Sequence, residues 1–128
     1  MRSIAAVVGG LVAWWVVATV ADFAVRALIP GYADVEHAMT YTFTLNMQVA
    51  RLVSGALASF VAGWVAARIA RGDRRAGWWL VIALLALFIP VHCGLWDRFP
   101  LWYHLIFLAS LVGATLAGAA LVRRDSKQ

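Results

Sequence analysis

The stretch "AGWWLVIALLALFIPVHCGLWDRFPLWYHLIFLASLVGATLAGAALV", residues 76–122, contains two long apolar runs with one short polar break between them. A helix needs about 20 residues to cross a bilayer core of roughly 30 Å, and both Ala76–Trp96 and Phe99–Val122 reach that length. Only Asp97 and Arg98 separate the two runs, so the chain must turn back within a few residues. The stretch therefore predicts a pair of antiparallel membrane-spanning helices.

Two further apolar runs precede this pair, at Ile4–Ala21 and Leu52–Ala67. The second is short for a membrane crossing unless Arg51 also lies within the membrane. Of the 128 residues, 64% are hydrophobic and 13% are charged, which is more apolar surface than a water-soluble domain of this size can bury. We therefore predict an all-α integral membrane four-helix bundle, a single domain over residues 1–128 with helices at about 4–28, 41–70, 77–96 and 100–122.

The charges are distributed unequally between the two ends of the predicted helices. One end carries eight basic residues against two acidic ones, 8 − 2 = +6, and the other end carries three against four, 3 − 4 = −1. This is the positive-inside pattern, which predicts an up-down-up-down bundle with both termini cytoplasmic, in a bacterial cytoplasmic membrane. The basic residues of the first end are Arg2, Arg68, Arg71, Arg74, Arg75, Arg123, Arg124 and Lys127.

The net charge of +5 is thus explained by topology, and we do not expect nucleic-acid binding. Arg71, Arg74 and Arg75 are expected to contact anionic lipid headgroups. A cleaved signal peptide at Met1–Ala21 is the alternative for the first run, which is long for such a peptide.

Each predicted helix carries an ionisable residue at a similar height near its outer end. Counted from the cytoplasmic end at about 1.5 Å per residue, these residues lie at heights of roughly 24 to 27 Å. They are Asp22, Arg51, His92 and His104. We therefore expect them to share one polar layer in the outer third of the membrane.

The partner of the arginine in this layer can also be predicted. An unpaired charge at that depth costs about 3 kcal/mol, so Arg51 is expected to face the bundle and to be offset by Asp22. Arg26 follows Asp22 at a spacing of four residues, and it is expected to compete for the same carboxylate. The layer, including Arg26, is either a ligand-binding pocket or a structural feature that fixes helix register.

Small and aromatic residues have simpler interpretations. Gly55, Ser59 and Gly63 form a small-xxx-small ridge, expected to pack within the bundle or against a second copy or partner subunit. The turn between the last two predicted helices is rich in aromatic residues. The residues expected to act as anchors at the headgroup interface are Trp96, Trp102 and Tyr103.

The sequence contains no Ser–His–acid arrangement and no Gly-rich phosphate loop, so we do not expect an enzyme. The favoured hypothesis is an accessory or scaffold subunit of a larger membrane assembly. A second hypothesis is an oligomeric small-solute or ion transporter, or a binding protein, that uses the polar layer as its pocket. A third is a redox protein that binds a quinone or a haem, with His92 and His104 as haem ligands. No metal site is expected, because no further ligand has metal-site spacing.

Overall fold

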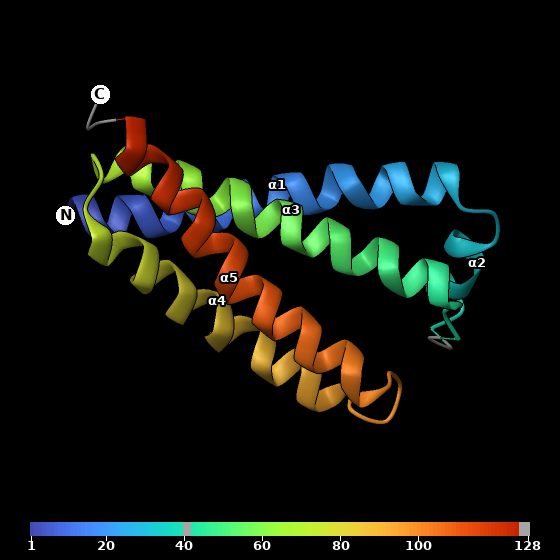
Figure 1. Ribbon diagram of the computed structural model, residues 1–128. Helices are drawn as coiled ribbons and strands as arrows, with labels where there is room; N and C mark the ends of the chain where they lie inside the picture. Colours follow the sequence, from blue (N-terminus) through green and yellow to red (C-terminus); the bar gives the residue numbers. More distant parts are fainter. Residues whose placement is uncertain (40–41, 126–128) are drawn as a thin grey trace.

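The computed structural model describes residues 1–39 and 42–125, with only the backbone of residue 125. Its helices are α1 (Arg2–Leu28), α2 (Tyr32–His37), α3 (Leu45–Ile69), α4 (Arg74–Gly94) and α5 (Leu101–Asp125). Figure 1 shows this order along the chain, and no strand occurs among the described residues. All of these helices except α2 are long and apolar enough to cross a membrane. The prediction of an all-α chain with four long apolar helices is therefore confirmed.

The helix ends follow from local hydrogen bonds. The Thr44 side chain accepts a hydrogen bond from the Met47 N–H at 3.4 Å, so α3 begins at Leu45. Its predicted start at residue 41 lies outside the described residues. Asp73 caps α4 in the same way, by accepting from the Arg75 N–H at 3.0 Å.

The connection after α1 contains a short helix that was not expected from the sequence. Gly31 adopts a φ of 81°, a left-handed conformation that glycine reaches without steric cost. The chain therefore turns sharply after Pro30 and enters α2 at Tyr32, whose side chain is only 1% exposed. The turn directs α2 back towards the ends of α1 and α3 (Figure 1).

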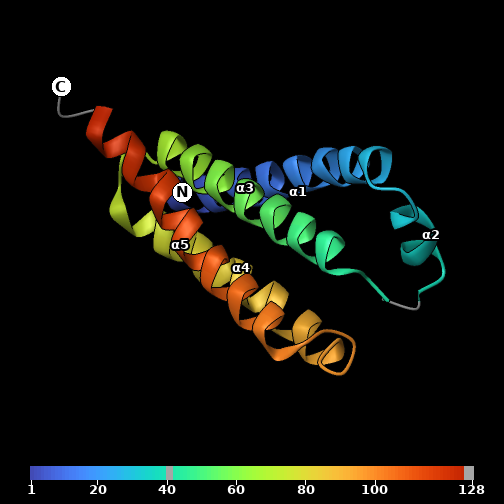
Figure 2. The same cartoon turned by 45° about the vertical axis from the view of Figure 1, so that its right-hand side comes forward.

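Helix α3 is the centre of the bundle and lies between α1 and α5 (Figures 1 and 2). Two glycines let α3 and α5 approach until their backbones touch. A Cβ atom at Gly63 would overlap the carbonyl of Thr115, and a Cβ atom at Gly118 would overlap the carbonyl of Phe60. This contact holds α5 against α3 through backbone proximity, without any large interlocking side chain.

Helix α1 packs most closely against α3 and α4 over its first half, where its buried residues lie. Gly10 lies against Leu80 of α4 and the carbonyl of Ala62 of α3, next to the core formed around Ala6. The Trp14 indole N–H then donates to the Ser59 hydroxyl of α3 at 3.0 Å. Beyond this point α1 and the α4–α5 hairpin diverge towards the end that carries α2 (Figures 1 and 2).

The two ends of the molecule differ in composition. The N-terminus, the α3–α4 turn and the C-terminal end of α5 lie at one end (Figure 1). The basic side chains of Arg2, Arg71 and Arg74 belong to these segments. The opposite end holds α2 and the α4–α5 turn, and a second core gathers there around Tyr32, Phe99 and Tyr103.

Candidate functional site

A cavity of about 480 Å³ lies where α1 and α4 diverge, and we name it the α1–α4 cleft. Helices α3 and α5 supply its floor, and α2 contributes to its outer end. Its polar lining residues are Thr19, Asp22, Arg26, Tyr32, Glu36, Arg51, Ser54, His92 and Tyr103. Its large apolar lining residues are Trp14, Trp15, Phe23, Val25, Phe88, Val91, Leu95, Phe99 and Phe107.

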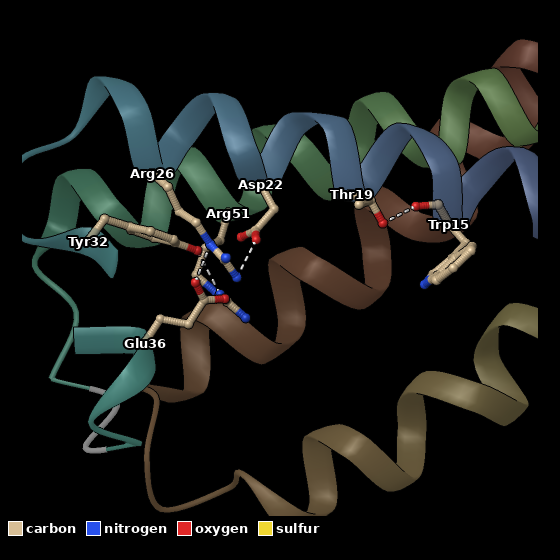
Figure 3. A network of polar contacts seen from close by, with 7 residues as sticks. All are labelled: Trp15, Thr19, Asp22, Arg26, Tyr32, Glu36 and Arg51. Carbon is tan, nitrogen blue, oxygen red and sulfur yellow. Dashed lines mark hydrogen bonds and ion pairs between the residues drawn. The ribbon is translucent and has the colours of Figure 1, made fainter. Parts of the chain in front are cut away.

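The acidic end of the cleft is organised around Arg26. Its Nη2 lies 2.8 Å from Asp22 Oδ2, one helical turn earlier on α1, and its Nε lies 2.8 Å from Glu36 Oε2 on α2 (Figure 3). We call Asp22, Arg26 and Glu36 the carboxylate triad, after its two acidic members. One guanidinium for two carboxylates leaves the triad with a formal charge of −1.

Arg51 of α3 forms a cationic centre beside the negatively charged triad (Figure 3). Its Nη1 donates to the Tyr32 hydroxyl at 2.8 Å, and its Nε donates to the Tyr103 hydroxyl at 3.3 Å. The guanidinium carbon also lies 4.8 Å from the centre of the Phe43 ring and 5.9 Å from that of Phe99, at cation–π distance.

The prediction that Arg51 pairs with Asp22 is wrong. Asp22 pairs with Arg26, and no carboxylate oxygen of a described residue lies within 4.0 Å of the Arg51 guanidinium. The reason lies in α2, which places Tyr32 at Arg51, while Arg26 is already one turn from Asp22 on α1. Asp22 and Arg51 nevertheless line the same cleft.

Burial affects the acidity of the tyrosine on α2. Desolvation raises the pKa of the Tyr32 hydroxyl above its ordinary value, while the nearby Arg51 charge opposes the rise. Tyr32 therefore stays protonated at neutral pH. Its oxygen accepts from Arg51, and its hydrogen stays available to donate to another acceptor.

The two histidines meet at the wall of the cleft. His92 Nδ1 lies 2.6 Å from His104 Nδ1, so one nitrogen donates a proton and the other accepts it. His92 lines the cleft, whereas His104 lies behind it, 1% exposed, with its Nε2 3.4 Å from the carbonyl oxygen of Trp96.

The histidine geometry bears on the haem hypothesis. Metal–nitrogen bonds are about 2 Å long, so a metal between the two Nδ1 atoms would need them well beyond 2.6 Å apart. The His92–His104 pair does not fit bis-histidine ligation through these atoms. Among the described residues, no group of three or more His, Cys, Asp or Glu side chains could hold a metal ion.

The deeper part of the cleft is aromatic. Trp14 is held by Ser59 and lies 4.6 Å, centroid to centroid, from the ring of Phe88. Trp15 is 70% exposed, and Figure 3 shows its indole on the side of α1 that faces α4. The polar groups are thus continuous with an apolar channel between α1 and α4.

The structure brings Asp22, Arg26, Arg51 and His92 together in one cleft, while His104 joins them only through His92. Sequence reasoning missed Glu36, Tyr32 and Tyr103 as participants. The Pro30–Gly31 turn was the available signal that the next residues return to the bundle, although it does not itself indicate a helix.

No protein-family model, curated protein or solved structure matches the chain. A charged polar end joined to an aromatic channel suits a ligand with a polar head and an apolar tail.

Proposed function

We propose that the chain is an integral membrane protein that crosses the bilayer four times, up-down-up-down, with both termini in the cytoplasm. Four long apolar helices support the crossings, and so do the large apolar side chains exposed along them, among them Ile4, Val12, Val53 and Ile82. The basic N-terminus, α3–α4 turn and C-terminal end of α5 support a cytoplasmic location for that end.

We propose further that the protein binds an amphipathic ligand in the α1–α4 cleft, with the ligand's head in the outer leaflet. The observation that carries this proposal is Arg51, a cation held by two tyrosine hydroxyls with no carboxylate within 4.0 Å among the described residues. A charge at this depth in a membrane is costly and is a mark of function by default. Arg51 also opens onto the cleft rather than facing lipid.

The shape of the cleft supports entry from the side. Helices α1 and α4 diverge towards the outer end, and the space between them is lined by Trp15, Val91 and Leu95. In the proposed orientation this gap faces the acyl chains of the outer leaflet. A lipid-like molecule can place its tail there and its head at Arg51 without leaving the membrane.

A role as an accessory or scaffold subunit has one observation in its favour. Helix α1 buries only Ala6 and Gly10, so most of its surface is open to lipid or to another subunit. A partner that covered this surface would leave the cleft between α1 and α4 in place, so the two roles are compatible. Co-purification of a further membrane protein at a fixed ratio would support this second role.

Filling the cleft tests the binding proposal. Ala18 lines the cleft, whereas Ala24 is an exposed residue of α1 outside it. We expect Ala18→Trp to lose amphipathic molecules retained during purification in mild detergent, as measured by native mass spectrometry, and Ala24→Trp to keep them. Equal retention by both variants, with both folded by circular dichroism, would contradict the proposal.

A further inference from the structure

We infer that the head of the ligand is a phosphate joined to a primary ammonium group, as in a phospholipid of the phosphatidylethanolamine class. This inference rests on the proposed function, because it names the ligand of the same cleft. It follows from the two oppositely charged centres in the cleft, the Arg51 guanidinium and the carboxylate triad of Asp22, Arg26 and Glu36.

Arg51 supplies the phosphate-binding half. A guanidinium carries five N–H donors in a planar fork that matches phosphate oxygens, and the tyrosines use two of them. Tyr32 and Tyr103 each accept from Arg51 and retain a hydroxyl hydrogen that can be donated. A phosphate at Arg51 would therefore meet a cation and two neutral donors, fixed by their mutual hydrogen bonds.

The carboxylate triad supplies the ammonium-binding half. Asp22 and Glu36 each place one oxygen on Arg26, at 2.8 Å, and the second oxygen of each can accept from another donor. Figure 3 shows the two carboxylates close together beside the Arg51 guanidinium. A primary ammonium has three N–H donors and one positive charge, which balances the formal charge of −1 on the triad.

The combination of Arg51 with the carboxylate triad favours one class of headgroup over others. Two arginines and two carboxylates give the charged groups of the cleft a net charge of zero. A purely anionic headgroup would be attracted by Arg51 and repelled by Asp22 and Glu36. A quaternary ammonium carries the right charge but has no N–H to donate, so it cannot hydrogen-bond the carboxylate oxygens that Arg26 does not contact.

The apolar walls indicate a lipid as the source of this headgroup. The aromatic channel continues from the polar end past Trp15 and Phe88. A small water-soluble phosphoamine has no apolar part that could contact this channel. A volume of about 480 Å³ is in the usual range for a small-molecule site, and it accommodates a headgroup together with the first part of a tail.

Competition between matched lipids tests the inference. The full chain, delipidated in detergent, is offered phosphatidylethanolamine, phosphatidylglycerol and phosphatidylcholine with identical acyl chains, and bound lipid is counted by native mass spectrometry. We expect a preference for phosphatidylethanolamine of about tenfold, the value of one charge-assisted hydrogen bond. Water-soluble glycerophosphoethanolamine is offered separately, and weaker binding of this compound identifies the lipid as the source.

Substitutions identify the residues that cause the preference for phosphatidylethanolamine. Glu36→Gln should lower binding of phosphatidylethanolamine towards the level of phosphatidylcholine, while Asp34→Asn, on the exposed side of the same helix, should leave it unchanged. Arg51→Gln should weaken all three phospholipids, with circular dichroism confirming the fold. Because Gln at position 36 can still accept from Arg26, the triad keeps a hydrogen bond and α2 keeps its place.

The outcomes separate the two proposals. Equal binding of phosphatidylglycerol and phosphatidylethanolamine, unaffected by Glu36→Gln, would overturn the headgroup inference and leave an amphipath-binding cleft. Tight binding of glycerophosphoethanolamine alone would overturn the lipid as the source and keep the headgroup chemistry. Failure of the wild-type protein to retain any amphipathic molecule would overturn the proposed function itself.

Discussion

The contact between α3 and α5 predicts that two chemically identical substitutions will have opposite effects. Gly63 lies where a Cβ atom would overlap the backbone carbonyl of Thr115, whereas a Cβ atom at Gly113 would have no atom of another helix within 4 Å. We expect Gly63→Ala to destabilise the bundle and Gly113→Ala to stabilise it.

The magnitude follows from two contributions. Replacing glycine by alanine inside a helix gains about 1 kcal/mol from helix propensity, and this gain applies at both positions. At Gly63 the added methyl group must also push α3 and α5 apart, and such overpacking costs about 1–3 kcal/mol. Subtracting the change in unfolding free energy of one variant from that of the other removes the propensity contribution. The difference should be about 1–3 kcal/mol, all of it from the contact between α3 and α5.

The assay is unfolding in mixed micelles with an increasing fraction of denaturing detergent, followed by far-ultraviolet circular dichroism. The free energy of unfolding of each variant is compared with that of the wild type. Equal stability of Gly63→Ala and Gly113→Ala would refute the close approach of α3 to α5 and, with it, the position of Tyr103 opposite Arg51.

Further predictions concern the cleft. Because burial raises the pKa of the Tyr32 hydroxyl, the unfolded chain releases this proton first as the pH passes about 10. The contribution of Tyr32 to the free energy of unfolding is therefore constant below that pH and falls above it, which pH-dependent unfolding of the wild type and of Tyr32→Phe will measure. His92→Phe leaves the buried His104 Nδ1 without its partner and should cost about 1–3 kcal/mol, with part of the loss recovered when His104→Phe is added, as a double-mutant cycle will measure. Arg51→Lys keeps the charge but loses the fork that contacts both tyrosines, and it should lower the free energy of unfolding by about 1–2 kcal/mol in the same detergent assay.

The four long helices could be predicted from the sequence because the length of an apolar run is a direct physical requirement for crossing a bilayer. The short helix α2 could not. Six residues are too few for a recognisable helical periodicity, and α2 is held by Tyr32, which contacts Phe43 and Arg51 in distant parts of the sequence. Such a helix owes its stability to tertiary packing rather than to its own propensity.

The candidate site, like the fold, could be predicted from the sequence only in part. The rise per residue is a constant of the α-helix, so the expectation of a shared level for Asp22 and Arg51 needed only counting. The hydrogen-bond partner of Arg51 depends on how α3 is rotated about its axis and on where α2 lies. Neither quantity is encoded in residue spacing, and Tyr103, interpreted as a headgroup anchor, instead accepts a hydrogen bond from Arg51 inside the bundle.

The position of a bound lipid tail tests the central claim most directly. A phosphatidylethanolamine with a photoreactive group in its acyl chain is reconstituted with the full chain, irradiated, and the adducts are mapped by peptide mass spectrometry. The account predicts adducts concentrated on Trp15 and Val91 in the cleft, and their loss in Ala18→Trp. Adducts spread evenly over those residues and over Val53 and Ile82, exposed outside the cleft, would contradict it.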